Sequence, residues 1–391
     1  MNTFVRVHGI CLLTLRLRYV LLLICSYCGT LEGNRRLAIF PDADLDSRPV
    51  FQLEWLGSPE LHGLSQKKAN ELYFRGPCYV AARDYDAKVP WGIRENYAQG
   101  RPLGSGAFSS VFEAVHMPSN RTYAVKVLNS IDQFRAVREI DVSLRMRFHP
   151  SVVTLYDAFQ TEDGRVALVL EHIKAIISRE QVMQEMNVEN LRRYMYTLLH
   201  VLDYASMHGV LHRDLDLGNV LIDGKENTLF VMDWGVSTFV SEEGHACDVG
   251  ADGYRAPELL LDFPFYDYPA DMWSAGVMFL EWLLRSPQVF RFGQDDVELF
   301  AIAQQLGTDG FHDLIRSRQI YCPPETVLRI GYLNNSKWLS LRNHENSSGI
   351  YSAEAVDLLD RMLRWVPEDR ISTADALSHP FFENIKDVLK I

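Results

Sequence analysis

The chain of 391 residues has only six cysteines, and three of them lie within its first 28 residues. The others, Cys78, Cys247 and Cys322, are far apart in the sequence. Three widely spaced cysteines match neither a disulfide framework nor a zinc-binding pattern. We therefore exclude both kinds of site and expect three buried or free thiols.

The chain also lacks an excess of basic residues, low-complexity runs and internal repeats. Its formal net charge is −12, with 47% hydrophobic and 23% charged residues. An acidic balance argues against non-specific attraction to nucleic acid, so we expect no nucleic-acid partner. The hydrophobic fraction excludes a disordered chain, and the length is sufficient for a sizeable core in two lobes.

Acidic residues are absent before Glu32. In this stretch three arginines precede the apolar run Tyr19–Cys25, and Ser26 and Cys28 stand at the minus-three and minus-one positions of a cleavage site. These features predict a signal peptide over residues 1–28 and a location in the secretory pathway, in the lumen or outside the cell. A mitochondrial transit peptide and an upstream extension of the gene are the alternatives. Because the run is short for a bilayer, we expect no stable membrane span after leader removal.

Sequence patterns divide the rest of the chain into three parts. Residues 29–96 show no sustained period and are interpreted as an N-terminal extension and arm. Short β-rich runs follow Tyr97 and include one helical pattern at Phe134–Phe148, whereas the chain after Glu171 is mostly helical. We predict an α+β fold in which a small antiparallel β lobe with one helix precedes a larger helical lobe, with a hinge at residues 171–173. The predicted strands cover residues 111–116, 123–128, 152–159 and 166–172, and the clearest later helices cover 188–208 and 272–284.

Two features of the β-rich part are typical of phosphate binding. The string LGSGAFSSVFEAV places Gly104 and Gly106 at a turn between strands, where missing side chains let backbone N–H groups approach phosphates. Alone this signal is weak, because a glycine-bearing turn is more often a plain hairpin. Lys126 lies in the following strand and Glu139 in the helix, an arrangement that favours an ion pair in which the lysine holds the α and β phosphates.

The helical part carries further residues expected for phosphoryl transfer. In LHRDLDLGN, Asp214 would orient an attacking hydroxyl, and Asn219 would hold a magnesium ion. LFVMDWG ends an apolar run with Asp233, the second expected magnesium ligand. YRAPE and PEDRIST resemble two motifs of protein kinases, and this resemblance implies a buried ion pair between Glu258 and Arg370. Each residue alone could be a surface charge or a turn former, but their joint order and spacing argue against coincidence.

In this order the motifs resemble those of protein kinases from Tyr97 to Phe382, which leaves residues 383–391 as a C-terminal tail. Longer strings narrow the resemblance to the catalytic α subunits of casein kinase II, a serine/threonine kinase family of the CMGC group. It implies a two-lobed protein-kinase fold and transfer of the γ-phosphate of ATP, or of GTP, to a protein hydroxyl with Mg²⁺. The strings include RDYDAKVPWGIRENY, GSGAFSSVFEAV, RYMYTLLHVLDYASMHGVLHRD, PELLLDFPFYDYPADMWSAGVM and RISTADALSHPFF.

The resemblance also implies site residues, partners and a further compartment. The expected catalytic residues are Asp214, Lys126, Glu139 and Asp216, and the expected metal ligands are Asn219 and Asp233. The expected nucleotide-binding residues are Leu103, Gly104, Ser105, Gly106, Val111, Ala124, Lys126, Glu171, Ile173 and Leu221. A regulatory subunit is a candidate partner, and the cytoplasm and nucleus are the compartments of the family.

Three acidic residues depart from the family's pattern. Asp216 stands where the family has a lysine beside the transferring phosphate, and Asp248 and Asp252 align with basic positions of the substrate loop. A negative charge near the γ-phosphate disfavours transfer. A slow or specialised kinase and a nucleotide-binding pseudokinase that acts as an interaction protein therefore both stay open. Because the cations that read acidic substrates are largely replaced, we expect a basic protein substrate.

Overall fold

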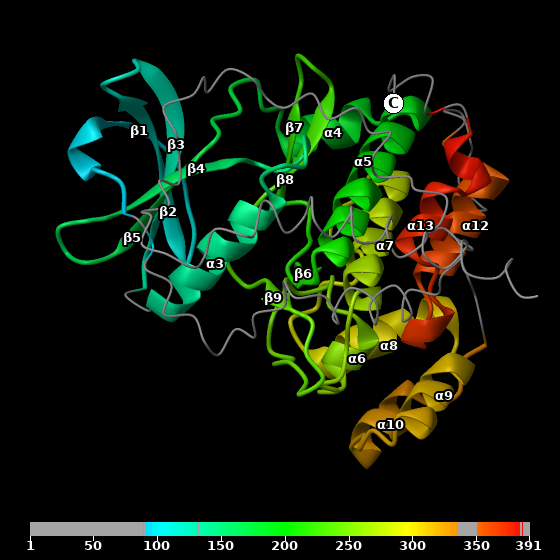
Figure 1. The fold of residues 1–391 in the computed structure, drawn as a ribbon. Coiled ribbons are helices and arrows are strands. Elements are labelled where there is room, and N and C mark those ends of the chain that lie inside the picture. The colour runs from blue at the N-terminus through cyan, green and yellow to red at the C-terminus, as the bar shows by residue number, and fades with distance from the viewer. Residues whose placement is uncertain (1–88, 90, 131–132, 335–349, 384, 386–391) are drawn as a thin grey trace, which may run out of the picture.

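The computed structural model describes residues 89, 91–130, 133–334, 350–383 and 385, which form two lobes (Figure 1). The small lobe is an antiparallel sheet with one helix and the large lobe is mostly helical, so the predicted α+β class is confirmed. The leader at residues 1–28, most of the extension at 29–96 and most of the tail at 383–391 lie outside the described residues.

Five antiparallel strands form the small lobe in the order β1-β2-β3-β5-β4. β2 and β3 are rich in β-branched and aromatic residues, which suit a half-buried pleated surface. They are joined by a turn at residues 117–120, where Asn120 has φ 54°, a left-handed conformation that asparagine tolerates. The strands are β1 (Tyr97–Ser105), β2 (Ser109–His116), β3 (Arg121–Leu128), β4 (Leu155–Gln160) and β5 (Val166–Leu170).

Two predicted strands were wrong at their ends near the hinge. β4 begins at Leu155 rather than at residue 152, because Val152 and Val153 pair with Val231 of the large lobe instead. The Val153 N–H donates to the Val231 carbonyl at 3.0 Å. β5 ends at Leu170 rather than at residue 172, where the chain leaves the sheet. An apolar run does not reveal which partner it will pair with, so periodicity alone overextended both strands.

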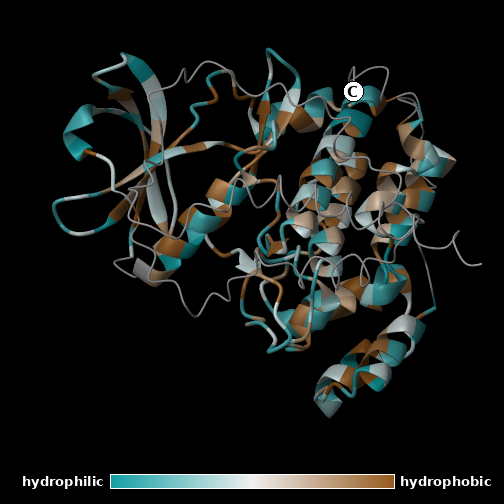
Figure 2. Cartoon of the chain, in the orientation of Figure 1, coloured by the Kyte–Doolittle hydropathy of each residue, from teal (hydrophilic) through white to brown (hydrophobic). Residues whose placement is uncertain are grey.

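Helix α3 (Gln133–Met146) packs on the sheet through one apolar face. Ala136 and Ile140 belong with Leu168 of β5 to one buried cluster. Brown and teal alternate along α3 in Figure 2, as expected for a helix with one buried and one solvent-facing side. This packing brings Glu139, on the same helix, toward the sheet.

The core of the large lobe lies around α5 (Val188–Met207) and α7 (Pro269–Leu284). The side chain of Asn187 caps α5 by accepting the Asn190 N–H at 2.9 Å. α7 begins one turn before the predicted residue 272, because proline suits the first turn of a helix. The other elements are α4 (Arg179–Glu185), β6 (Val210–Leu211), β7 (Val220–Asp223), β8 (Thr228–Val231), β9 (Thr238–Phe239), α6 (Pro257–Leu260), α8 (Asp295–Leu306), α9 (Asp309–Ser317), α10 (Pro324–Ile330), α12 (Ala353–Met362), α13 (Thr373–Leu377) and the 3-10 turns η3 (Arg94–Asn96), η4 (Pro367–Asp369) and η5 (Pro380–Phe382).

The last residues of the predicted arm pack on the small lobe. Val89 and Trp91 join the cluster between α3 and the sheet. The Gly92 N–H donates to the Ala158 carbonyl of β4 at 2.7 Å, and a Cβ at this glycine would collide with Asp157. The described end of the arm is therefore anchored to β4.

Two further expectations concern membranes and thiols. None of the helices in the described ranges is both long enough and apolar enough to cross a bilayer. Cys247 and Cys322 carry free thiols and are partly buried, whereas Cys78 lies outside the described residues.

Candidate active site

The small lobe contributes a glycine turn and a lysine on one face of the sheet. Strand pairing sets Gly104 of β1 opposite Val111 of β2, and Val111 opposite Lys126 of β3. Cross-strand partners share a face, so the turn and the lysine line the same side. A Cβ on Gly104 or Gly106 would meet no atom within 4 Å, which leaves room there for a ligand. The other predicted residues of this wall are Leu103 and Ser105, which are exposed, and Ala124, which is buried.

Lys126 connects three elements of the site. Its Nζ donates to Glu139 Oε1 of α3 at 2.7 Å and to Asp233 Oδ1 at 2.6 Å. Burial works against the charge of Lys126, but the two carboxylates outweigh it and hold the pKa of the ammonium above its usual value. The predicted ion pair between Lys126 and Glu139 is confirmed, and the same lysine also reaches across to the large lobe.

Asp233 lies two residues beyond β8 in a left-handed conformation with φ 62°. Its Oδ1 also accepts the Gly235 N–H at 3.2 Å. Although burial disfavours its charge, Lys126 holds the pKa of the Asp233 carboxyl below its usual value. The side chain is 37% exposed, so its ionised carboxylate remains accessible to a ligand.

The loop between β6 and β7 carries Asp214 and Asn219. Asn219 Nδ2 donates to the Asp214 carbonyl at 2.7 Å and to Asp214 Oδ2 at 3.0 Å. Burial raises the pKa of the Asp214 carboxyl, and the charges of Asp216 and Asp233 raise it further against the opposing effects of His212 and Asn219. A carboxylate of raised pKa at a partly open position is typical of a proton acceptor.

Asp271 of α7 supports this loop, and sequence reasoning missed it. Its carboxylate accepts the backbone N–H groups of His212 at 2.7 Å and Arg213 at 2.8 Å. Arg213 has φ 68°, a conformation that costs free energy unless the surroundings enforce it. Asp271 is buried, and burial raises the pKa of its carboxyl. The sequence signal that could have identified Asp271 was a carboxylate within the otherwise mostly apolar sequence of α7.

The Asp216 carboxylate accepts hydrogen bonds from backbone groups of its own loop. Oδ1 accepts the Gly218 N–H and the Asn219 N–H, each at 2.8 Å. The sequence placed Asp216 beside the transferring phosphate, where its charge would oppose transfer. Here the charge is directed at two backbone donors.

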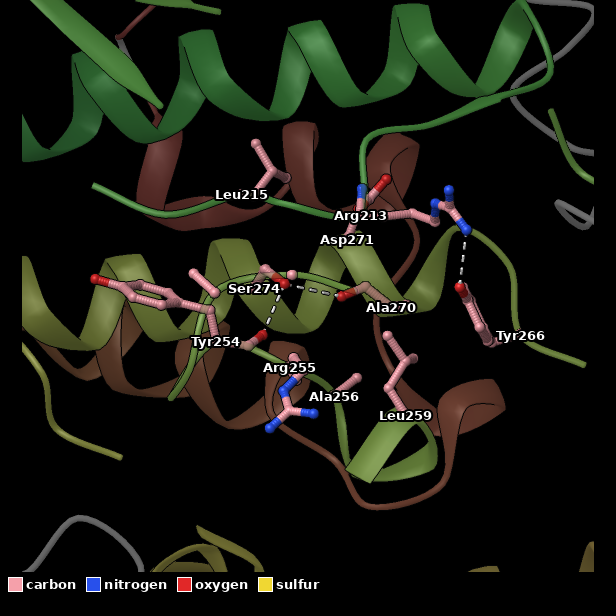
Figure 3. A pocket seen from close by; sticks show the side chains of 12 residues that line it. Arg213, Leu215, Tyr254, Arg255, Ala256, Leu259, Tyr266, Ala270, Asp271 and Ser274 are labelled. Atoms are coloured by element: carbon pink, nitrogen blue, oxygen red, sulfur yellow. Dashed lines mark hydrogen bonds between the residues drawn. The ribbon is translucent and has the colours of Figure 1, made fainter. Parts of the chain in front are cut away.

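The Arg213 guanidinium lies beside the segment that follows Asp233. Its Nε donates to the Val236 carbonyl at 2.8 Å. Its Nη1 donates to the Tyr266 hydroxyl at 3.3 Å (Figure 3). Ser274 of α7 donates to the Tyr254 carbonyl at 2.8 Å in the same region. The segment between Asp233 and α6 is therefore held near its start, at Val236, and near its end, at Tyr254.

The predicted ion pair at the end of the segment is confirmed. Arg370 donates to Glu258 through Nη1 at 2.7 Å and Nη2 at 2.6 Å, and both side chains are essentially inaccessible to solvent. Arg370 also donates to the Pro269 carbonyl at 2.8 Å, and its guanidinium lies 5.1 Å from the centre of a Trp273 ring. Through these bonds Arg370 joins α6 to the start of α7.

An apolar cluster lies where the two lobes are connected. Ile173 is buried with Val153 and Phe230, and Leu221 of β7 packs against them. The Glu171 N–H donates to the Thr154 carbonyl at 2.8 Å. Of the predicted nucleotide-binding residues, Ile173 and Leu221 are therefore brought together as an apolar surface suited to a nucleobase.

The polar residues fit a nucleotide with Mg²⁺. Asn219 and Asp233 supply two oxygen-bearing side chains, and the carbonyl of Asn219 accepts the Met232 N–H at 3.0 Å, which links their backbones. No group of three or more histidines, cysteines or carboxylates suited to a metal occurs among the described residues. Mg²⁺ in nucleotide sites takes few protein ligands and completes its shell with phosphates and water, so two suffice.

Comparison with protein families agrees with this geometry. The family model described as "Protein kinase domain" matches residues 97–382. That range contains the glycine turn, the lysine ion pair, the catalytic loop, Asp233 and the Glu258–Arg370 pair. The chain therefore belongs to the protein kinase family.

Proposed function

We propose that this chain is a serine/threonine protein kinase that transfers the γ-phosphate of ATP to a hydroxyl of a protein substrate. The observation that carries the proposal is the double ion pair of Lys126 with Glu139 and Asp233. A catalytically competent kinase site requires this lysine–glutamate pair and this aspartate together. Protein kinase domains generally bind ATP and Mg²⁺, and GTP is an alternative donor.

The roles of the side chains follow from their positions. Lys126 binds the α and β phosphates, and Glu139 holds it in place. Asp214 orients the substrate hydroxyl and accepts its proton as the oxygen–phosphorus bond forms and ADP leaves. Asn219 and Asp233 are the residues that would hold Mg²⁺, which supplies positive charge that neutralises the phosphates when it is bound.

A pseudokinase that acts as an interaction protein is the second candidate, and Asp216 is the observation that favours it. An anion about 4 Å from a γ-phosphate in place of a cation would oppose transfer by several kcal/mol at an effective dielectric near 20, as an order-of-magnitude upper limit. The bonds from Gly218 and Asn219 to its carboxylate weaken this argument, because the charge is partly neutralised locally.

The resemblance to casein kinase II catalytic subunits supports a CMGC-type serine/threonine kinase with an altered substrate preference. In the substrate loop Asp248 and Asp252 are exposed, and Arg255 is paired with Asp295 and lies 3.9 Å from Asp252. Because Arg255, the main cation of this loop, is already paired with Asp295, the loop suits a substrate with basic residues near its hydroxyl. A regulatory subunit remains a proposed partner, and the secretory pathway a proposed location.

A transfer assay beside a nucleotide-binding assay tests the proposal. Purified chain is incubated with radiolabelled ATP, Mg²⁺ and a mixed serine/threonine peptide library, and unfolding temperature is measured with and without ATP. We expect transfer by the unmodified chain, a loss of about 10²–10⁴-fold in Asp214→Asn, and no ATP-induced stabilisation in Lys126→Met.

Lys225→Met is the matched control, because Lys225 is 81% exposed and pairs only with its neighbour Glu226 in the described structure. This variant should bind and transfer like the unmodified chain. Stabilisation by ATP without transfer would favour the pseudokinase. No stabilisation at millimolar ATP and Mg²⁺ would contradict both candidates.

A further inference from the structure

Asp216 fixes the backbone of the catalytic loop just before its predicted metal ligand. The two N–H groups that its Oδ1 accepts belong to Gly218 and Asn219, both at 2.8 Å. An aspartate that accepts N–H groups two and three residues later holds a tight turn, and such a bond to an ionised oxygen is stronger than one to a neutral group. A lysine at this position has no acceptor and could not make either bond.

Asn219 is thereby held at three points. Its N–H donates to Asp216, its carbonyl accepts the Met232 N–H at 3.0 Å, and its side-chain Nδ2 donates to Asp214. Met232 directly precedes Asp233, so the two predicted metal ligands are linked through backbone groups. The Asn219 N–H also donates to the backbone carbonyl of Asp216 at 3.2 Å, so both bonds from Asp216 act on the residue directly before β7.

Arg179 of α4 lies near the turn that Asp216 forms. A Cβ added at Gly218 would lie 3.1 Å from Asp216 Oδ1 and 3.1 Å from Arg179 Nη2 of α4. The carboxylate and the guanidinium therefore flank the same point and can be no further apart than twice that distance.

We propose that Asp216 is a positioning residue for phosphoryl transfer, which places Asn219 for metal binding through the loop backbone and does not act on the phosphate itself. This inference rests on the proposed kinase function. It explains how the site accommodates an acid where the resembled family has lysine, since the acid replaces a phosphate contact by a loop constraint.

The chain contains a matched control for this turn. Asp223 Oδ1 accepts the N–H groups of Lys225 at 2.8 Å and Glu226 at 3.0 Å, in the same two- and three-residue pattern. That turn connects β7 to β8, and Lys225 and Glu226 are exposed. A change at Asp223 removes the same kind of bond and leaves Asn219 untouched.

The test compares Asp216→Ala, Asp216→Asn and Asp216→Lys with Asp223→Ala. The readouts are kcat, KM for peptide, and the Mg²⁺ concentration that gives half-maximal rate. We expect Asp216→Ala to lower kcat and raise the required Mg²⁺ by about tenfold, the scale of a lost capping interaction. Asp216→Asn keeps an acceptor oxygen, so it should recover most of both, and Asp223→Ala should alter neither.

Two outcomes would overturn the inference. If Asp216→Asn is as impaired as Asp216→Ala, the negative charge itself acts in transfer. If Asp216→Lys equals or exceeds the unmodified chain, the turn is dispensable and the phosphate contact is what matters; this comparison also decides the question should Asp216→Ala fail to fold. If the unmodified chain does not transfer phosphate at all, the proposed function fails, but Mg²⁺-dependent stabilisation by ATP, weakened in Asp216→Ala and retained in Asp216→Asn, would still support the positioning role.

Discussion

At the scale of single residues, the site concentrates three carboxylates that would repel one another in an ordinary protein interior. Asp214 is influenced by the charges of both Asp216 and Asp233, and burial adds to their effect on its pKa. Only Asp233 has a direct lysine partner, at 2.6 Å. Such an arrangement is costly for folding and is found where titration of one group serves a reaction.

The pH dependence of transfer should report this environment. Asp214 accepts a proton only when ionised, and its pKa is raised above the ordinary 3.8, so kcat/KM should fall as pH decreases through that raised value. Asp216→Asn removes one of the charges that raises the pKa, so the acidic limb should move to lower pH. The measurement is kcat/KM against pH with a peptide that does not titrate there. Asp223→Asn should leave the limb in place, and an unmoved limb in Asp216→Asn would contradict the electrostatic coupling.

At the scale of elements, short pieces of structure depend on contacts from elsewhere in the chain. α6 has a single turn, which is too short to be stable alone in water. It is held by the Glu258–Arg370 pair, in which Arg370 comes from the turn after η4, more than a hundred residues away. Because both side chains are fully buried, removing one of them leaves an unpaired charge in the interior.

Arg370→Met should therefore destabilise the fold by about 3–5 kcal/mol, measured by urea unfolding. The matched control is Arg361→Met, because Arg361 pairs with Asp357 on an exposed face of α12. An exposed helix pair contributes about 0.3–0.5 kcal/mol, so the control should change little. Equal effects of the two substitutions would show that burial of the pair is not what stabilises α6.

At the scale of the whole molecule, we expect net charge to influence which substrates approach the site. The net charge is −12, and the exposed acids Asp248 and Asp252 lie in the loop that precedes α6. Arg255 in that loop is engaged by Asp295 of α8. We therefore expect long-range attraction of basic substrates and repulsion of acidic ones, both of which salt would screen.

We expect basic serine/threonine peptides to be phosphorylated with higher kcat/KM than acidic ones, and the difference to shrink at high salt. Asp248→Arg with Asp252→Arg should reverse the preference. The control pair Asp163→Arg and Asp313→Arg makes the same change in net charge on exposed positions of the β4–β5 turn and α9, and should reverse nothing. A preference of the unmodified chain for acidic peptides by about tenfold, or 1.4 kcal/mol, would contradict this reading of the substrate loop.

The sequence by itself determined the two-lobed architecture and the identity of the main site residues. Strand and helix patterns predicted the two lobes, because hydrophobic period reflects which face an element buries. Lys126, Asp214, Asn219 and Asp233 were identified because their order and spacing match the motifs of protein kinases, in which they take part in phosphoryl transfer. The Glu258–Arg370 pair was also predicted, from the resemblance of YRAPE and PEDRIST to motifs of protein kinases.

Only the tertiary structure decided how those side chains are used. The support of Arg213 by Asp271 and the start of β4 depend on partners far away in sequence. The direction of the Asp216 carboxylate depends on the backbone conformation of its own loop. A carboxylate accepts from whichever donors the fold brings within about 3 Å, and sequence spacing does not record that distance. The same residue type could oppose a phosphate or hold a turn, and the folded loop directs Asp216 to Gly218 and Asn219.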